Sequence, residues 1–217
     1  MTLRVEAYQR FTRGLLAREI RAGQFVSQRQ LSEITGMSLG AIREMVPRLE
    51  ADGLIRTVPQ RGMQVAQVDV NLIRNAFQLR LILEREAAAA FAQQAPEAEF
   101  DRLQEAHEAV LALAARAVTP ALIARAQATD DGMHAAIVDA LGNDIISNYF
   151  RVNSLKIRLI RQAQTRIDTT LVVPVMTEHL SVIAALRTRD PVVAATAMAE
   201  HINRARNRAL GVEYEAR

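Results

Sequence analysis

Apolar residues recur at helical spacing through most of the chain, and only one short region has the pattern of β-strands. Spacings of three and four residues predict amphipathic helices over residues 3–21, 71–94, 97–116, 120–141, 144–166, 174–187 and 191–210. Thr119-Pro120 and Asp190-Pro191 each place an N-cap residue directly before a first-turn proline, which marks the start of two of these helices. The expected fold is therefore mainly α.

The exception lies within residues 26–66. Two short helical patterns meet at Gly36, and glycine enters left-handed conformations at little cost, which permits a tight turn. Ser38 stands where the second pattern needs an N-cap, and Gly53 follows that pattern as a C-cap. Two short extended runs come next, on either side of a Pro-Gln-Arg-Gly turn. Two helices followed by a two-stranded wing predict a winged helix-turn-helix, which places a helix in the major groove of DNA.

Several polar side chains of this motif suit DNA. A recognition helix presents its N-terminal residues to base edges, and the guanidinium of Arg43 can bind guanine through two hydrogen bonds. The hydroxyl of Ser38 can donate to a phosphate, and Arg61 at the wing tip can reach a phosphate or the minor groove. The alternative is that each arginine is a solvated surface charge. We predict as DNA-binding positions Arg29, Ser38, Leu39, Arg43, Arg61 and Gly62.

The rest of the chain predicts a second, all-α domain. We place the winged domain at residues 1–66, a linker without glycine or proline at 67–69, and six helices at 70–217. Charge follows this division. Residues 1–66 hold ten Arg and six acidic residues, a net +4, whereas residues 67–217 hold 17 basic and 18 acidic residues, a net −1. The positive excess lies in the part assigned to DNA.

The composition also limits the class of protein. The chain has no cysteine, which excludes disulfides and thiolate metal sites. It has no uncharged apolar run of about 18 residues, so we expect no membrane span. Its first residues carry charges through every turn, unlike a secretory signal. We therefore expect a cytoplasmic protein.

Three of the four histidines fall on apolar faces of the predicted helices. Asp130 and His134 are four residues apart and so are neighbours on one face, while His179 and His201 lie on two later helices. Buried polar groups need partners, and three imidazoles with one carboxylate could satisfy one another around a divalent metal. Nitrogen and oxygen ligands without sulfur suit Zn²⁺ first, with Ni²⁺ or Mn²⁺ as alternatives. The other reading, that each histidine is a satisfied core or surface residue, stays open.

Arg80 and Glu84 share a helix face with large apolar residues, so we expect them to be buried rather than to form a solvated ion pair. A buried arginine near a metal favours a carboxylate ligand. We predict Arg80 and Arg158 as effector-binding residues, although the sequence does not distinguish Arg158 from Arg161.

The motifs resemble a known family. The run G-x-x-V-S-x-x-x-L-S-E-I-T-G-M-S-x-G-A-I-R-E-M-V-x-R-L-E-A-D-G-L-I, followed by P-x-R-G-M-x-V, resembles the GntR family of bacterial transcription regulators. D-x-x-x-H and E-H-x-x-V-I-x-A-L-x-x-x-D, with a histidine 22 residues after His179, resemble its FCD ligand-binding domain. The six helices resemble the VanR-like branch of the FadR-type subfamily. The resemblance implies a metal held by Asp130, His134, His179 and His201.

The chain departs from the family pattern in two places, and one histidine stands outside it. Leu39 occupies a position where many members have arginine, and Pro47 lies inside the recognition helix and should bend it. Asp131 is a less favoured ligand than Asp130, because its helix face lacks large core residues. His107 matches no motif, and we expect it on the surface.

The leading hypothesis is a regulator that binds a palindromic operator as a homodimer, and the family pattern favours a repressor. A small organic acid bound over the metal would shift the population of DNA-binding arrangements. The alternatives are a metal-dependent hydrolase that uses the same three histidines and aspartate, and an architectural DNA-binding dimer without an effector.

Overall fold

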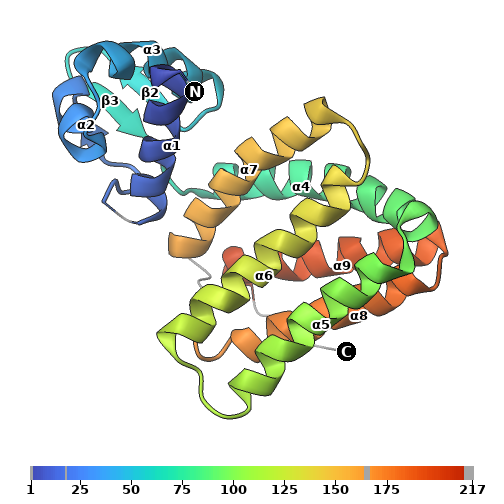
Figure 1. The fold of residues 1–217 in the computed structure, drawn as a ribbon. Coiled ribbons are helices and arrows are strands. Elements are labelled where there is room, and N and C mark those ends of the chain that lie inside the picture. The colour runs from blue at the N-terminus through green and yellow to red at the C-terminus, as the bar shows by residue number, and fades with distance from the viewer. Residues whose placement is uncertain (1, 18, 164–166, 213–217) are drawn as a thin grey trace.

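The computed structural model describes residues 2–17, 19–163 and 167–212, and it has a small winged domain beside a larger helical one (Figure 1). The winged domain contains α1 (Leu3–Leu16), β1 (Phe25–Val26), α2 (Gln28–Thr35), α3 (Leu39–Ala51), β2 (Ile55–Val58) and β3 (Gly62–Val65). The helical domain contains α4 (Val70–Gln94), α5 (Glu97–Ala114), α6 (Pro120–Asp139), α7 (Asp144–Ala163), α8 (Val172–Arg187) and α9 (Pro191–Ala209). The predicted fold class, mainly α with a small β-wing, is confirmed.

Local sequence signals explain the winged domain. The side chain of Ser27 accepts from the Gln30 amide, and the Gln30 side chain accepts from the Ser27 amide, which completes a capping box before α2. Gly36 closes α2 with φ of 64°, and Ser38 caps α3 by accepting from the Ala41 amide at 3.3 Å. The three strands pair antiparallel in the order β1-β3-β2, so the segment before α2 joins the wing.

The first helix is shorter than the sequence predicts. We expected a helix over residues 3–21, but α1 ends at Leu16. The Gly14 carbonyl accepts from the amides of Glu19 and Ile20, at 2.9 and 3.2 Å, which turns the chain back on itself. The Ile20 side chain then packs against Gly14, where a Cβ would come within 3.4 Å of it. Ile20 is thus part of the core, as its apolar character suggests, but reaches it from a turn.

Helices α3, α7 and α8 also follow the predicted pattern with small differences. Helix α3 continues through Pro47 to Ala51. Helix α8 begins at Val172 rather than at residue 174, which leaves Pro174 in the first turn, where proline is tolerated. The predicted helix over 144–166 is observed as α7 up to Ala163, and its last three residues lie outside the described part of the chain. Among the described residues, no helix is both long and apolar enough to cross a membrane.

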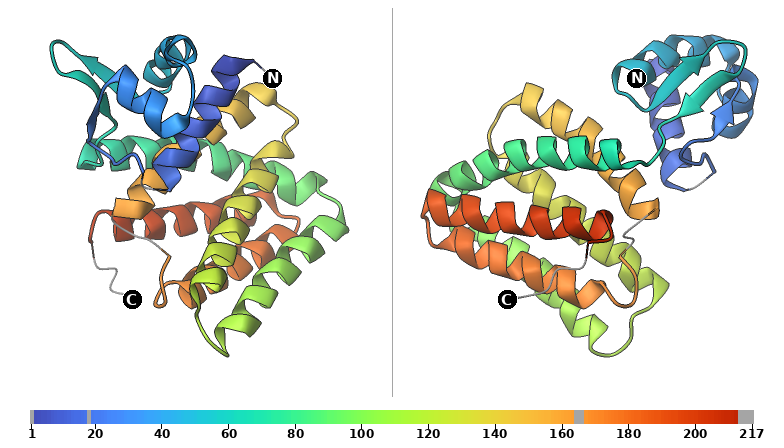
Figure 2. Two further views of the ribbon diagram at one scale, coloured as in Figure 1. Left: turned by 60° about the vertical axis from the view of Figure 1, so that its left-hand side comes forward. Right: turned by 180° about the vertical axis from the view of Figure 1, so that it is seen from behind.

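Helix α7 joins the two domains. In the helical domain α4 and α9 lie side by side (Figure 2), and α7 crosses α4 on the side of the winged domain. Leu159 of α7 is buried in the hydrophobic core of the winged domain, and Leu155 packs against the same core. The Gln162 side chain donates to the Leu16 carbonyl at the end of α1. These contacts fix α7 against the winged domain.

Candidate functional site

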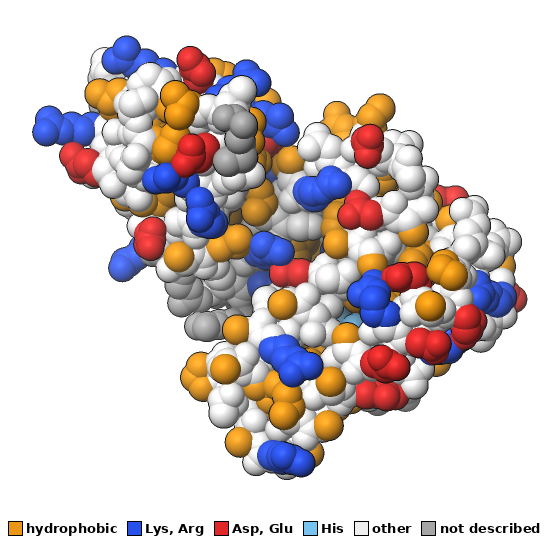
Figure 3. Space-filling model, in the orientation of Figure 1, with side chains coloured by type: hydrophobic (Ala, Val, Ile, Leu, Met, Phe, Trp, Pro, Cys, Tyr) orange, Lys and Arg blue, Asp and Glu red, His pale blue; other side chains and the backbone are white. Residues whose placement is uncertain are grey.

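The predicted DNA-binding residues all lie at the surface of the winged domain. The exposed set comprises Arg29, Ser38, Leu39, Arg43, Arg61 and Gly62. Leu39 is the first residue of α3, and 43% of its surface is exposed. The Arg43 Nε donates to the Gln28 side chain at 3.2 Å, an exposed contact that a base or phosphate can replace. Figure 3 shows Lys and Arg side chains spread over the visible face of this domain.

The tip of the wing is held in one conformation. Gly62 has φ of +86°, and a Cβ there would lie 3.1 Å from the Val26 carbonyl oxygen, so a larger residue is disfavoured. The Arg61 guanidinium lies over the ring of Phe25, 4.3 Å from its centroid. This cation–π contact supports the arginine beside the wing while its side chain stays exposed.

The candidate metal centre is built from three helices. His134 of α6, His179 of α8 and His201 of α9 are all buried, and one nitrogen of each lies within 4.8 Å of the other two. The Oδ1 of Asp130, one turn before His134, is 3.4 Å from Nε2 of His179. The structure thus brings together the four residues proposed from the sequence.

Each of these imidazoles has a polar group close to its Nδ1. The Nδ1 of His134 lies 2.6 Å from a carboxylate oxygen of Glu84, and that of His201 lies 3.2 Å from Glu178. The Nδ1 of His179 lies 3.1 Å from Nε2 of His107. The Nε2 atoms of His179 and His201 lie 3.3 Å apart at the centre of the cluster, whereas Nε2 of His134 lies 2.6 Å from Nη2 of Arg80.

The prediction that His107 lies on the surface is wrong. His107 is fully buried, and its Nδ1 lies 2.6 Å from the Leu103 carbonyl oxygen. The sequence contained a signal that could have found this position. His107 follows Phe100 and Leu103 and precedes Val110 at helical spacing, and all three belong to the core.

Burial and charge fix the protonation states of the site. Burial lowers the pKa of His179 well below its usual range, and it lowers the pKa of His201 to about 4. Burial alone would raise the pKa of Asp130, but Arg161 and the neighbouring histidines hold it well below normal. Burial is likewise outweighed at Glu84, where Arg80 and His134 lower the pKa to about 2.

The site therefore offers the neutral imidazoles of His179 and His201 and the ionised carboxylate of Asp130. Two Nε2 lone pairs that face each other at 3.3 Å without a proton between them are unfavourable unless a cation lies near them. Neutral histidine and ionised aspartate are the forms that bind divalent metals. The residues present fit such an ion.

Arginines border the candidate metal centre. The Arg80 Nε donates to Glu84 and its Nη2 donates to Nε2 of His134, both at 2.6 Å. The Arg80 Nη1 is buried and has no hydrogen-bond partner among the described residues. Arg161 makes a bidentate ion pair with Asp130, and Arg158 pairs with Asp131 at 2.8 Å. The expected burial of Arg80 and Glu84 is confirmed, and Arg161, rather than Arg158, contacts the candidate ligand Asp130.

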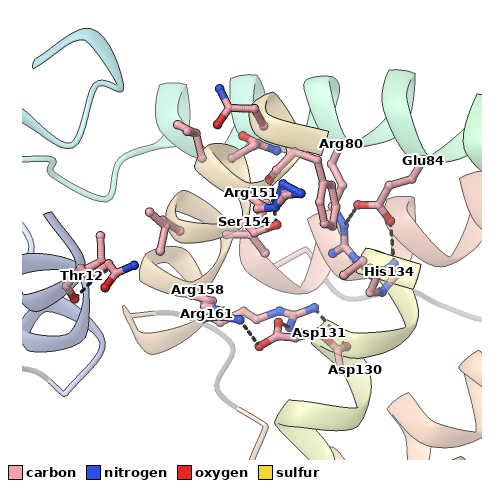
Figure 4. A pocket seen from close by; sticks show the side chains of 18 of the residues that line it. Thr12, Arg80, Glu84, Asp130, Asp131, His134, Arg151, Ser154, Arg158 and Arg161 are labelled. Atoms are coloured by element: carbon pink, nitrogen blue, oxygen red, sulfur yellow. Dashed lines mark hydrogen bonds and ion pairs between the residues drawn. The ribbon is translucent and has the colours of Figure 1, made fainter. Parts of the chain in front are cut away.

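A cavity of about 370 Å³ connects this region with the winged domain. Figure 4 shows Arg80 and His134 at one side of it and Thr12 of α1 at the other. Arg158 and Arg161 extend from α7 toward the carboxylates of α6 between them. A molecule in this cavity would meet basic groups of the helical domain and side chains of the winged domain.

Comparison with known proteins identifies the family. Residues 3–65 match the bacterial regulatory proteins of the gntR family, and residues 75–204 match the FCD domain. The chain belongs to the FCD-domain group of the GntR family. It is thus a DNA-binding transcription regulator by family, and such regulators are typically not enzymes.

Solved structures of GntR-family regulators share the fold. McbR/YncC of E. coli is 18% identical with a TM-score of 0.72, and the match covers 94% of this chain and 95% of that one. A putative GntR regulator from Rhodococcus sp. RHA1 is 15% identical with a TM-score of 0.76, over 97% of this chain and 99% of that one. A search of curated proteins found no significant match.

Proposed function

We propose that this GntR-family regulator binds a palindromic operator as a homodimer and responds to a small carboxylate held beside a divalent metal. In this proposal residues 1–66 bind DNA, residues 67–69 form the linker, and residues 70–217 bind the effector and dimerise. Repression relieved by the effector is the mode we propose. The observation that carries the proposal is the convergence of three buried imidazoles, those of His134, His179 and His201, and the Asp130 carboxylate beside the buried Arg80.

The chemistry of Arg80 favours a carboxylate effector. A divalent cation held by Asp130, His134, His179 and His201 supplies positive charge and a coordination position for an anion. When Nε2 of His134 serves as a metal ligand, the Arg80 Nη2 loses the acceptor that it has here. Both Nη groups can then donate to one carboxylate, which is the bidentate geometry that arginine favours. Arg158 is the second effector-binding residue that we propose, since it lines the same cavity.

Helix α7 offers a physical route from the effector to DNA. Its Arg158 and Arg161 pair with the acids of α6 at the metal centre, while its Leu159 lies in the core of the winged domain. A ligand that changes the pairing of these arginines would bias the position of α7, and so of the winged domain, by its differential affinity for the two arrangements.

Exposed apolar side chains support the homodimer. Ile82 of α4 is 62% exposed, and Ile145 and Tyr149 of α7 are 70% and 61% exposed. Helices α4 and α7 pack against each other, so these side chains lie on neighbouring elements. Two winged domains held at a fixed spacing would reach successive major grooves of a palindrome.

To test this proposal, fluorescence anisotropy measures how tightly the protein binds DNA from upstream of its own gene. The Zn²⁺-loaded protein is titrated at several salt concentrations with a panel of small carboxylic acids, with and without a chelator. We expect specific binding that one acid weakens, and we expect the chelator and Arg80→Ala each to abolish that response. Arg102→Ala, at an exposed arginine of α5, is the control and should respond normally. A response unchanged by chelator and by Arg80→Ala would refute the metal and carboxylate parts.

A further inference from the structure

The structure assigns to His107 the role of a positioning residue that holds His179 in the tautomer able to bind a metal through Nε2. This inference rests on the proposed metal centre but concerns a residue outside the family's four-ligand motif. His107 comes from α5, which contributes none of the four proposed ligands. Its ring packs edge-on against that of His179, with the centroids 5.1 Å apart.

The direction of the hydrogen bonds follows from one fixed acceptor. A backbone carbonyl oxygen can only accept, so Nδ1 of His107, 2.6 Å from the Leu103 carbonyl, carries a hydrogen. His107 is fully buried and has no carboxylate partner among the described residues, so its ring is neutral and its Nε2 is an acceptor. Nδ1 of His179 must then donate to it across 3.1 Å, which leaves Nε2 of His179 as a lone pair directed at the cluster.

The three candidate histidine ligands differ in what holds them. Glu84 and Glu178 engage His134 and His201 with carboxylates, whereas His179 is engaged by a neutral imidazole. Both glutamates are themselves paired with an arginine, Arg80 and Arg208 respectively. His107 therefore orients the third ligand without bringing another charge into the core, and the site avoids an extra buried anion that would oppose an anionic effector.

The experiment compares His107→Leu, which removes the acceptor, with His107→Gln, which keeps one. Zn²⁺ affinity is measured by competition with a chromophoric chelator, and the Co²⁺ absorption spectrum reports the ligand set. We expect His107→Leu to weaken metal binding about 10–100-fold and to change the Co²⁺ spectrum. His107→Gln should recover most of the affinity. Val110→Ala removes buried volume from the same helix away from the cluster and should leave the metal affinity unchanged.

A folded His107→Leu protein with wild-type metal affinity would overturn the inference, as would a loss that His107→Gln does not reverse. A second measurement uses the wild-type protein, so the packing of His107 is unaltered. Side-chain ¹⁵N NMR of the wild-type apoprotein should show His179 protonated at Nδ1, whereas protonation at Nε2 would refute the assignment. If the wild-type protein binds neither Zn²⁺ nor Co²⁺, the proposed metal centre fails, and the NMR result still decides the role of His107.

Discussion

Two arginines in this molecule have the same local sequence arrangement and opposite surroundings. Arg29 in the winged domain and Arg80 in the helical domain each pair with a glutamate four residues later, Glu33 and Glu84. The side chains of the first pair are 86% and 64% exposed, at 3.3 Å, and those of the second are 4% and 0% exposed, at 2.6 Å. An exposed ion pair contributes little to stability and exchanges partners readily. A buried pair is fixed, because breaking it leaves an unpaired charge in the core.

The same difference in exposure distinguishes the residues proposed to bind DNA from those proposed to bind the metal. The candidate DNA-binding residues are exposed and loosely held, so they are free to bind phosphates and bases. The four candidate metal ligands and Arg80 are buried, and hydrogen bonds and ion pairs connect them to one another and to their neighbours. Substitutions should therefore reduce DNA affinity without unfolding the first region, and should disturb both folding and binding in the second.

The largest effect is expected for Glu84→Gln. It leaves the Arg80 charge buried without compensation and should lower the free energy of unfolding by about 3–5 kcal/mol, measured by urea denaturation. Glu33→Gln is the matched control at the exposed pair and should change stability by less than about 1 kcal/mol. Equal losses in the two variants would remove the contrast between the domains.

Adding a metal provides a second test of this contrast, because all four candidate ligands lie in the helical domain. At a Zn²⁺ concentration 100 times its dissociation constant, the free energy of unfolding should rise by about 2.7 kcal/mol. The melting temperature should rise as well, by roughly 2–4 °C for each kcal/mol for a chain of this size. His201→Gln should abolish the shift, and Mg²⁺, which prefers oxygen ligands, should produce little. A shift that survives His201→Gln would place the metal elsewhere.

The substitution Arg43→Ala should weaken DNA binding and leave the stability of the fold unchanged. We expect the free energy of operator binding to weaken by about 1–3 kcal/mol while the melting temperature is unchanged, because the side chain is exposed and its hydrogen bond to Gln28 is exposed as well. Binding is measured by anisotropy at constant salt. Arg125→Ala, an exposed arginine of the helical domain, is the control for net charge. If both variants bind equally well, Arg43 is not a DNA contact.

The smallest effect is expected at Ser38, where structural and DNA-binding roles coincide. Ser38→Ala removes the N-cap of α3 and should lower stability by about 1 kcal/mol. Ser38→Asp keeps a capping side chain, so stability should be retained, but its negative charge should repel phosphate and weaken DNA binding. Normal operator binding by Ser38→Asp would show that DNA does not approach this end of α3.

The sequence predicted the winged domain well because its signals are local. Gly36 and Ser38 act within a few residues of their own positions, and each has the expected turn or capping role. The early end of α1 could not be predicted in this way, because it depends on Ile20 folding back onto Gly14.

In the helical domain the sequence identified residue types on apolar faces but not their partners. Asp130, His134, His179 and His201 could be grouped, because each lies at helical spacing on its own helix. The bond from His107 to His179 spans 72 residues, so no local pattern contains it. The same holds for Arg161, since its choice of Asp130 depends on how α6 and α7 cross.

The placement of contacts along α7 sets which genetic changes the chain can tolerate. Leu155, Leu159 and Gln162 face the winged domain, and the interleaved Arg158 and Arg161 face the acids of α6. Each residue advances an α-helix by about 100°, so inserting or deleting one residue within this stretch would turn one set of contacts away from its partners. Amino-acid substitutions can alter either set of contacts separately. A change in length would disconnect the winged domain from the candidate metal centre in a single step.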